Sequence, residues 1–177
     1  MKNSYPEISF YQEDCSILKQ PLTIGVKTAP NRLVCQPMEG CDGTVEGRPG
    51  ELTLRKYQRL AEGGSGLIWV EATSISHEAR ANPRQLWMTK ENKDSFKQLV
   101  ELIHTSAQKA GFEKPLLILQ VTHSGRYSKP EGKPKPIIAY HNPIFEKEPL
   151  PDGCIISDEE LDALPQKFAA TAGMAEE

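Results

Sequence analysis

Polar side chains follow three short apolar runs of the sequence, and their types could do chemistry. The three runs cover residues 33–37, 66–72 and 116–121, and polar residues lie at or just after the end of each. The most informative polar residue is Gln120. Burying a glutamine at the end of an apolar run is costly unless its amide finds partners. Because an amide offers both donors and an acceptor, it suits a flat heterocycle with imide groups. The alternative is a core glutamine whose hydrogen bonds the protein itself satisfies.

Four other polar residues in these stretches each leave two interpretations open. His123 could bind a substrate oxygen or simply hold its loop, and Arg126 could clamp an anion or pair with a carboxylate. Glu39 and Glu71 both lie near strand ends, which suggests paired carboxylates for acid–base chemistry. The pattern favours the other interpretation, in which each glutamate is solvated or salt-bridged.

The four cysteines form no Cys-x-x-Cys pair, and no His residues are spaced to complete a zinc site. Free thiols are therefore expected, and no metal site is predicted. Cys41 is notable because it follows the first apolar run.

The apolar runs are nearly continuous, which predicts parallel strands buried on both faces. Between them, Thr53 is expected to cap a helix that ends at Gly63-Gly64. Apolar residues at helical spacing predict a second helix over 96–110. A third opens with the capping box 157–160, and Pro165 is expected to kink it.

This order of elements predicts a parallel α/β sheet with right-handed crossovers. No glycine-rich phosphate loop occurs, so a (β/α)8 barrel is favoured over a doubly wound nucleotide-binding sheet. In both folds ligands bind at the carboxyl ends of the strands. A barrel needs about 250 residues, so these 177 residues are expected to form its N-terminal part, about three βα units plus the start of the next helix.

Composition sets the broad class of the protein. Apolar residues make up 38% and charged residues 25%, with a mean hydropathy of -0.50 and no apolar run long enough for a membrane span. The N-terminus lacks the apolar core of a signal peptide, so a cytoplasmic protein is expected. A net charge of -3 without a basic stripe argues against nucleic acid as the main partner.

Several motifs together resemble one family. The chain resembles the Old Yellow Enzyme-like NADH:flavin oxidoreductases, FMN-dependent (β/α)8 barrels that include 2,4-dienoyl-CoA reductase-like enzymes, over the segments 21–25, 31–38, 57–72, 81–86 and 120–127. The resemblance is colinear from about residue 18 to residue 177. It implies one domain over 1–177, in which 1–31 form an N-terminal segment and a hairpin at the barrel floor.

The resemblance also implies roles for particular residues. Gln120 would partner the flavin pyrimidine ring, and the flavin would also contact Pro37, Met38, Glu39 and Ala72. Many members carry Thr or Cys at the position of Glu39. A glutamate there could raise the cost of anionic reduced flavin, or turn away and leave only its N–H on the ring.

His123 and Arg126 match the family's His-x-Gly-Arg stretch at the active-site face. Six prolines lie between Pro130 and Pro151, which predicts one long loop over 124–156. Because that loop follows the third strand, it is expected to cover the flavin or line the substrate entrance.

The implied activity is hydride transfer from NAD(P)H through FMN to an activated alkene, such as an enoate, an enone or a dienoyl thioester. Groups for the FMN phosphate and the substrate carbonyl would fall beyond Glu177, so this chain alone is expected to be inactive and to hold FMN weakly. One alternative is a non-catalytic barrel fragment.

Another alternative is a tRNA-dihydrouridine synthase-like FMN barrel, although its Asn-x-Gly-Cys-Pro motif is missing. The substrate, the choice of NADH or NADPH, any iron–sulfur or second flavin domain and any homo-oligomer stay open.

Overall fold

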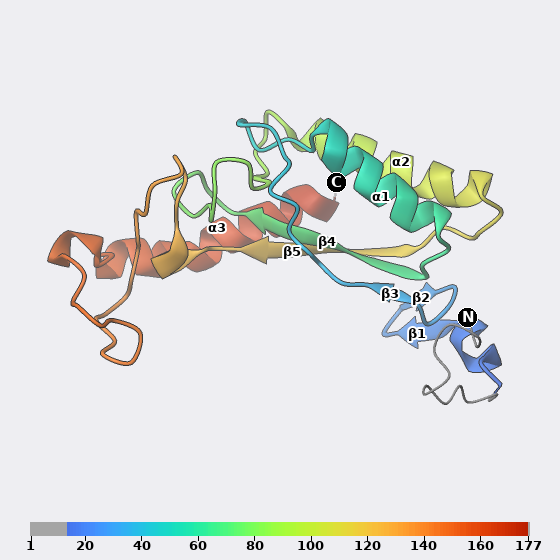
Figure 1. Ribbon diagram of the computed structural model, residues 1–177, viewed down its shortest axis with the longest axis horizontal. Coiled ribbons are helices and arrows are strands. Elements are labelled where there is room, and N and C mark those ends of the chain that lie inside the picture. The colour runs from blue at the N-terminus through green and yellow to red at the C-terminus, as the bar shows by residue number, and fades with distance from the viewer. Residues whose placement is uncertain (1–13, 177) are drawn as a thin grey trace, which may run out of the picture.

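The computed structural model describes residues 14–176, so part of the predicted N-terminal segment lies outside the described residues. Its centre is a parallel sheet in the order β3-β4-β5, formed by β3 (Val34–Cys35), β4 (Leu67–Ser74) and β5 (Leu116–Thr122). Helix α1 (Glu51–Glu62) joins β3 to β4, and α2 (Lys93–Lys109) joins β4 to β5. Both helices cover the same face of the sheet (Figure 1). The three predicted strands and the alternation of strands with helices are confirmed.

The main core lies between the sheet and the two helices. Ile68 and Val70 alternate along β4 onto the helix side, where they pack on Tyr57, Leu99 and Ile103. All five side chains are at most 5% exposed. This packing holds β4 as the central strand and therefore fixes where its carboxyl end lies.

The first residues of α1 differ from the prediction, and those of the last helix confirm it. Helix α1 begins one residue after Gly50, so Thr53 is not its N-cap residue but lies inside the first turn, where its hydroxyl accepts a hydrogen bond from the Gly50 N–H at 3.1 Å. Helix α3 (Asp158–Glu176) starts with the predicted capping box, in which Ser157 and Glu160 exchange two hydrogen bonds of 3.2 Å. The helix continues through Pro165, where the sequence predicts a kink.

The hairpin implied by the family resemblance is present. Strands β1 (Leu22–Ile24) and β2 (Lys27–Ala29) pair antiparallel around a tight turn, after a short 3-10 helix, η1 (Ser16–Lys19). Gly25 has a φ of 60°, which a glycine adopts without strain. The hairpin lies near the end of the sheet where the parallel strands begin (Figure 1). No helix within residues 14–176 is long and apolar enough to cross a membrane.

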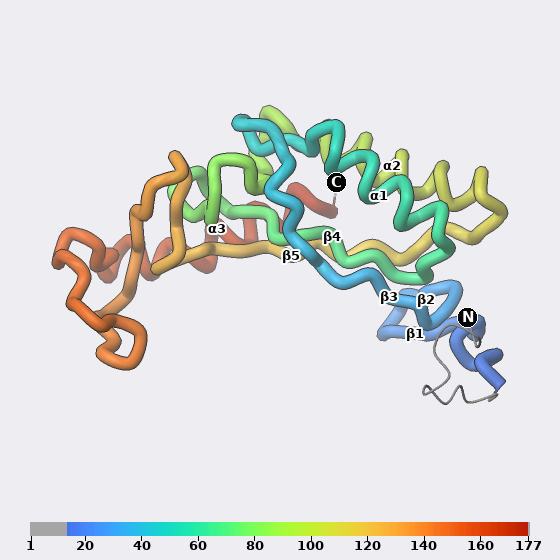
Figure 2. The backbone as a smooth tube through the Cα atoms, in the orientation of Figure 1, coloured from blue at the N-terminus to red at the C-terminus, as the bar shows by residue number. Residues whose placement is uncertain are grey.

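The long loop projects beyond the carboxyl end of β5 (Figure 2) and contains two short 3-10 helices, η2 (Gly125–Tyr127) and η3 (Asp152–Cys154). The side chain of Glu146, only 4% exposed, organises it. This carboxylate accepts hydrogen bonds from Arg126 at 3.0 Å and from the Asn142 N–H at 3.1 Å, and it contacts His141 Nδ1 at 2.8 Å. The loop is therefore tied together by one buried acid.

The first prediction tests the core. Leu99→Ala removes a buried side chain between the sheet and α2 and is expected to cost about 2–5 kcal/mol of unfolding free energy. Gln98→Ala, on the exposed side of the same helix, should change it by less than about 0.5 kcal/mol. Urea unfolding followed by circular dichroism measures both variants, and equal effects would contradict this account of the core.

The second prediction concerns pH and the long loop. Hydrogen bonding to Glu146, and then to Asp152, raises the pKa of His141 above its usual 6.5. Charged His141 therefore stabilises the loop fully below pH 6.5, and this contribution is lost as the pH rises through the raised pKa. A protease of broad specificity, such as proteinase K, is expected to cut near Lys133 and Lys135, at the exposed part of the loop.

The His141→Gln variant provides the comparison at each pH, which cancels the protease's own pH dependence. The variant should be cut faster than the wild type at pH 6, and the two rates should converge above the raised pKa. A rate ratio that is independent of pH would show that the charge on His141 does not hold the loop.

Candidate functional site

The pairing of β4 with β5 is interrupted where the polar residues lie. Val70 pairs with Leu119 and Thr73 pairs with Val121, so Glu71 and Ala72 together oppose the single residue Gln120. Such a bulge bends a strand and redirects its side chains, and bulges are common beside active sites. Two residues predicted from separate motifs, Ala72 and Gln120, are therefore neighbours across the sheet.

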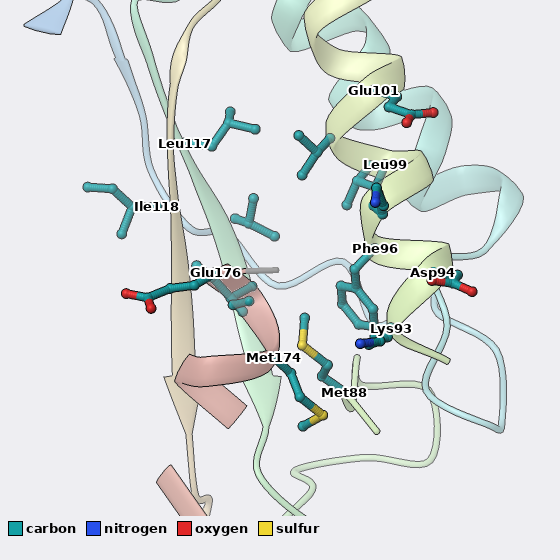
Figure 3. Close-up of a pocket in the computed structure, with 15 residues that line it drawn as sticks. Met88, Lys93, Asp94, Phe96, Leu99, Glu101, Leu117, Ile118, Met174 and Glu176 are labelled. Carbon is teal, nitrogen blue, oxygen red and sulfur yellow. The ribbon is translucent and has the colours of Figure 1, made fainter. Parts of the chain in front are cut away.

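The amide of Gln120 is available to a ligand. It is half-buried, and within residues 14–176 its side chain makes no hydrogen bond. Figure 3 shows Leu117 pointing toward α2 and Ile118 pointing to the other side of β5. Because side chains alternate along a strand, Gln120 shares the side of Ile118, away from α1 and α2. None of the described residues therefore satisfies this amide.

The segment after β3 is tied to the same place. The Gly40 N–H donates to Glu71 Oε1 at 2.9 Å, and Lys56, which pairs with Glu71 Oε2, lies with its Nζ 3.5 Å from the Met38 carbonyl oxygen. The Met38 side chain is 74% exposed. The backbone after Pro37 therefore lies at the carboxyl edge of the sheet, close to the bulge that contains Ala72 and faces Gln120.

Glu71 is fully committed to the protein. Its side chain is 1% exposed, and Tyr57 OH donates to Oε2 at 3.0 Å while accepting the Glu71 N–H at 2.7 Å. Burial, with the charge of Glu71, raises the pKa of Tyr57, which keeps the hydroxyl protonated. Of the two interpretations, the structure shows a salt-bridged Glu71 and not one of a pair of acid–base carboxylates.

The carboxylate of Glu39 is held by the loop between β4 and α2. Its Oε1 accepts a hydrogen bond from Asn82 Nδ2 at 2.8 Å. Burial raises the pKa of Glu39, and the negative charge of Glu71 adds to that effect, while the bond from Asn82 opposes it. The side chain is thus directed to Asn82 in this structure.

Cys41, two residues further on, has a φ of 50°. Its Sγ accepts a hydrogen bond of 3.3 Å from Asn82 Nδ2, the same group that binds Glu39. Burial and the charge of Glu39 raise the pKa of its thiol. A thiol of this kind is protonated and is a poor nucleophile.

His123 and Arg126 both hold the start of the long loop. The Gly125 N–H donates to His123 Nδ1 at 3.0 Å, so the neutral ring carries its proton on Nε2 and keeps one donor. Burial lowers the pKa of His123, which favours that neutral form. The guanidinium of Arg126 pairs with Glu146 and lies 5.6 Å from the centre of the Phe145 ring. The loop-holding and carboxylate-pairing interpretations are the ones that this structure shows.

Sequence reasoning missed the roles of Lys56, Tyr57, Asn82 and Glu146. One signal was available, because Lys56 adjoins the inward-facing Tyr57 on a helix that must pack beside a strand ending in a glutamate. The other two act across loops and have no periodic signature. Within residues 14–176, no group of three His, Cys, Asp or Glu side chains could hold a metal ion.

A separate groove of about 490 Å³ lies on the helix side of the sheet, between α2, β5 and the end of α3. Figure 3 shows Phe96, Met88 and Met174 gathered at one end of it. Its floor is apolar, and the polar residues of the bulge lie elsewhere. The groove is therefore distinct from the candidate site.

Comparisons with known proteins show the family and the fold of the chain. The family model of the NADH:flavin oxidoreductase / NADH oxidase family matches residues 18–177. An NADPH dehydrogenase of Geobacillus sp. is 32% identical over 121 residues, which are 67% of this chain and 33% of that protein. An NADPH dehydrogenase of Halalkalibacterium halodurans is 29% identical over 145 residues, which are 80% of this chain and 39% of that protein.

A solved structure of morphinone reductase in complex with tetrahydroNAD superposes with a TM-score of 0.70 at 24% sequence identity, over 90% of this chain and 46% of that chain. The chain thus spans less than half the length of these relatives. The superposition shows the fold, the N-terminal part of a (β/α)8 barrel, as the order of elements predicted. Since the family model covers nearly the whole chain, the chain belongs to the NADH:flavin oxidoreductase / NADH oxidase family.

Proposed function

We propose that this chain forms one side of an FMN site in an oxidoreductase that passes a hydride from NADH or NADPH, through the flavin, to an activated alkene. The acceptor class would be an enoate, an enone or a dienoyl thioester. The observation that carries the proposal is the unpartnered amide of Gln120, opposite the bulge at Ala72 and beside the anchored segment after β3. Family membership supports the flavin and nicotinamide chemistry.

The residues at this edge suit a flat ring with an imide edge. The Gln120 amide can both donate to such an edge and accept from it, which is the complementarity that an imide needs. Ala72 is small enough to let a ring approach the sheet closely, and the backbone of Pro37, Met38 and Glu39 would form a wall beside it. FMN, when bound, supplies the hydride-transfer chemistry, and the protein supplies orientation and electrostatics.

His123 and Arg126 would act at the entrance from the long loop. With Nδ1 occupied by the Gly125 N–H, His123 can offer a substrate oxygen only its Nε2–H. Arg126 already has a carboxylate partner in Glu146, so its proposed role is to keep the loop in place beside the substrate. The structure describes three parallel barrel strands, and the proposal therefore concerns their place in a complete barrel.

The third prediction tests Gln120 within the complete barrel. Gln120→Leu keeps the volume but removes the amide, so the polar groups of the ring stay desolvated and unpaired at a cost of about 1–3 kcal/mol. FMN affinity should fall about tenfold or more, since about 1.4 kcal/mol is tenfold. Gln108→Leu, on the exposed end of α2, is the matched control. Unchanged flavin affinity in Gln120→Leu would show that Gln120 has only a structural role.

The fourth prediction separates the chain from the barrel. Fluorescence titration of the 177-residue chain with FMN should show only weak binding, because barrels of this kind commonly bind phosphate at loops after their last two strands. The complete barrel should bind FMN and oxidise NADH or NADPH in the presence of an enone such as 2-cyclohexenone. A complete barrel without either property would refute the proposed function, and submicromolar one-to-one binding by the chain alone would refute the expectation of a shared site.

A further inference from the structure

The segment Met38–Gly40 has no helix or strand of its own, yet it is anchored at both ends. Its local support is one backbone hydrogen bond, from the Met38 N–H to the Gln36 carbonyl at 2.8 Å. Contacts from distant parts of the sequence add to it: Glu71 receives the Gly40 N–H, Lys56 lies near the Met38 carbonyl, and the Glu39 side chain is held by Asn82. Of these, the contacts from β4 and α1 are the ones that hold the backbone itself.

The carboxylate of Glu71 divides its two oxygens between two tasks. Oε2 faces α1, where it meets the Lys56 ammonium and the Tyr57 hydroxyl. Oε1 faces the segment after β3 and accepts the Gly40 N–H. A carboxylate that is 1% exposed must have its charge and its lone pairs satisfied, and here both requirements are met by groups from two other elements. One buried acid thus couples the position of α1 to that of the segment.

Gly40 allows this close approach. A Cβ at residue 40 would lie 2.7 Å from Lys56 Nζ and 2.6 Å from Asp42 Oδ2. Both groups are the ends of flexible side chains and would have to shift, and a shift of the ammonium would disturb its pairing with Glu71.

We propose that Glu71 is a positioning residue of the flavin site: through its Oε1 it fixes the Met38–Gly40 backbone, and Lys56 balances its charge. The inference rests on the proposed function, because that backbone is where the flavin ring would lie. Glu71 acts through Gly40 and not by touching the ring. Its two oxygens make the positioning task separable from the task of holding α1 to β4.

Matched variants separate the two tasks. Glu71→Ala removes both, whereas Leu60→Ala loosens the packing of α1 on the core and leaves Glu71 and its bond to the Gly40 N–H in place. Glu71→Gln removes the charge and leaves one acceptor oxygen, which can serve either the Gly40 N–H or the donors of α1, while its NH2 group faces the other donor. Hydrogen exchange of the Gly40 amide, followed by NMR on the 177-residue chain, reads the anchor directly and needs no flavin.

The Gly40 amide should exchange at least tenfold faster in Glu71→Ala than in the wild type, after normalisation to the core amides of Ile68 and Ile103. Leu60→Ala should leave that normalised rate unchanged, and Glu71→Gln should fall between the wild type and Glu71→Ala. Equal acceleration in Leu60→Ala, or a Gly40 amide that stays protected in Glu71→Ala, would show that Glu71 only supports the core and would overturn the proposal.

FMN titration of the complete barrel gives the second readout. Glu71→Ala should weaken FMN binding at least tenfold, and Leu60→Ala should leave it unchanged. If the wild-type barrel binds FMN and Glu71→Ala binds it equally well, the positioning role is wrong while the proposed function stands. If the wild-type barrel binds no FMN, the proposed function fails with the flavin part of this inference, and the exchange rates still decide whether Glu71 anchors the segment.

Discussion

A buried carboxylate at the end of the central strand is the constraint on which the carboxyl edge of this sheet depends. Glu71 is 1% exposed, and an acid so placed is tolerated only where neighbouring groups replace its water. Lys56 and Tyr57 come from α1, and the Gly40 N–H comes from the segment after β3. The requirement to satisfy one charge therefore brings three elements together at the point where the bulge redirects Ala72.

The same acid shapes the electrostatics of its surroundings. Glu39 and Glu71 bring two carboxylates to this edge, and Lys56 is the cation that pairs with one of them. Burial and the charge of Glu71 raise the pKa of Glu39, so Glu39 takes up a proton more readily than a solvated glutamate. A further negative charge at this edge would be repelled by ionised Glu39 and attracted by Lys56. The hydrogen bond from Asn82 keeps the Glu39 carboxylate in place and links it to the loop after β4.

The parts of the structure that follow from local pattern could be predicted from the sequence. Near-continuous apolar runs predicted the strands, helical spacing predicted α2, and the capping box marked the start of α3. Thr53 was predicted as the N-cap residue of α1 but is the third residue of its first turn. The sequence did not separate these positions, because a threonine at either one uses its hydroxyl to bind a backbone N–H at the start of the helix. Residue type at a strand end singled out Gln120, and the family resemblance added Ala72.

The parts that depend on partners far apart in the sequence could not be predicted from residues alone. The bulge that sets Gln120 opposite Ala72 is a property of the pairing of two strands, which periodicity does not reveal. Gly40 and Glu71 are 31 residues apart, and Arg126 and Glu146 are 20 apart within a loop that has no repeating pattern. Each of these contacts settles a choice that spacing left open, such as whether Arg126 meets an anion or a carboxylate of its own chain.

The central claim is that a flavin ring lies against this edge of the sheet, and amide shift mapping tests it most directly. The 177-residue chain, labelled with ¹⁵N, would be titrated with millimolar FMN, a concentration at which weak binding is still visible. The account predicts shifts in the Gln120 side-chain amide and in the backbone amides of Met38, Glu39 and Ala72, with no shifts in the groove beside Val100. Shifts confined to that groove, or scattered over the surface without the Gln120 amide, would contradict it.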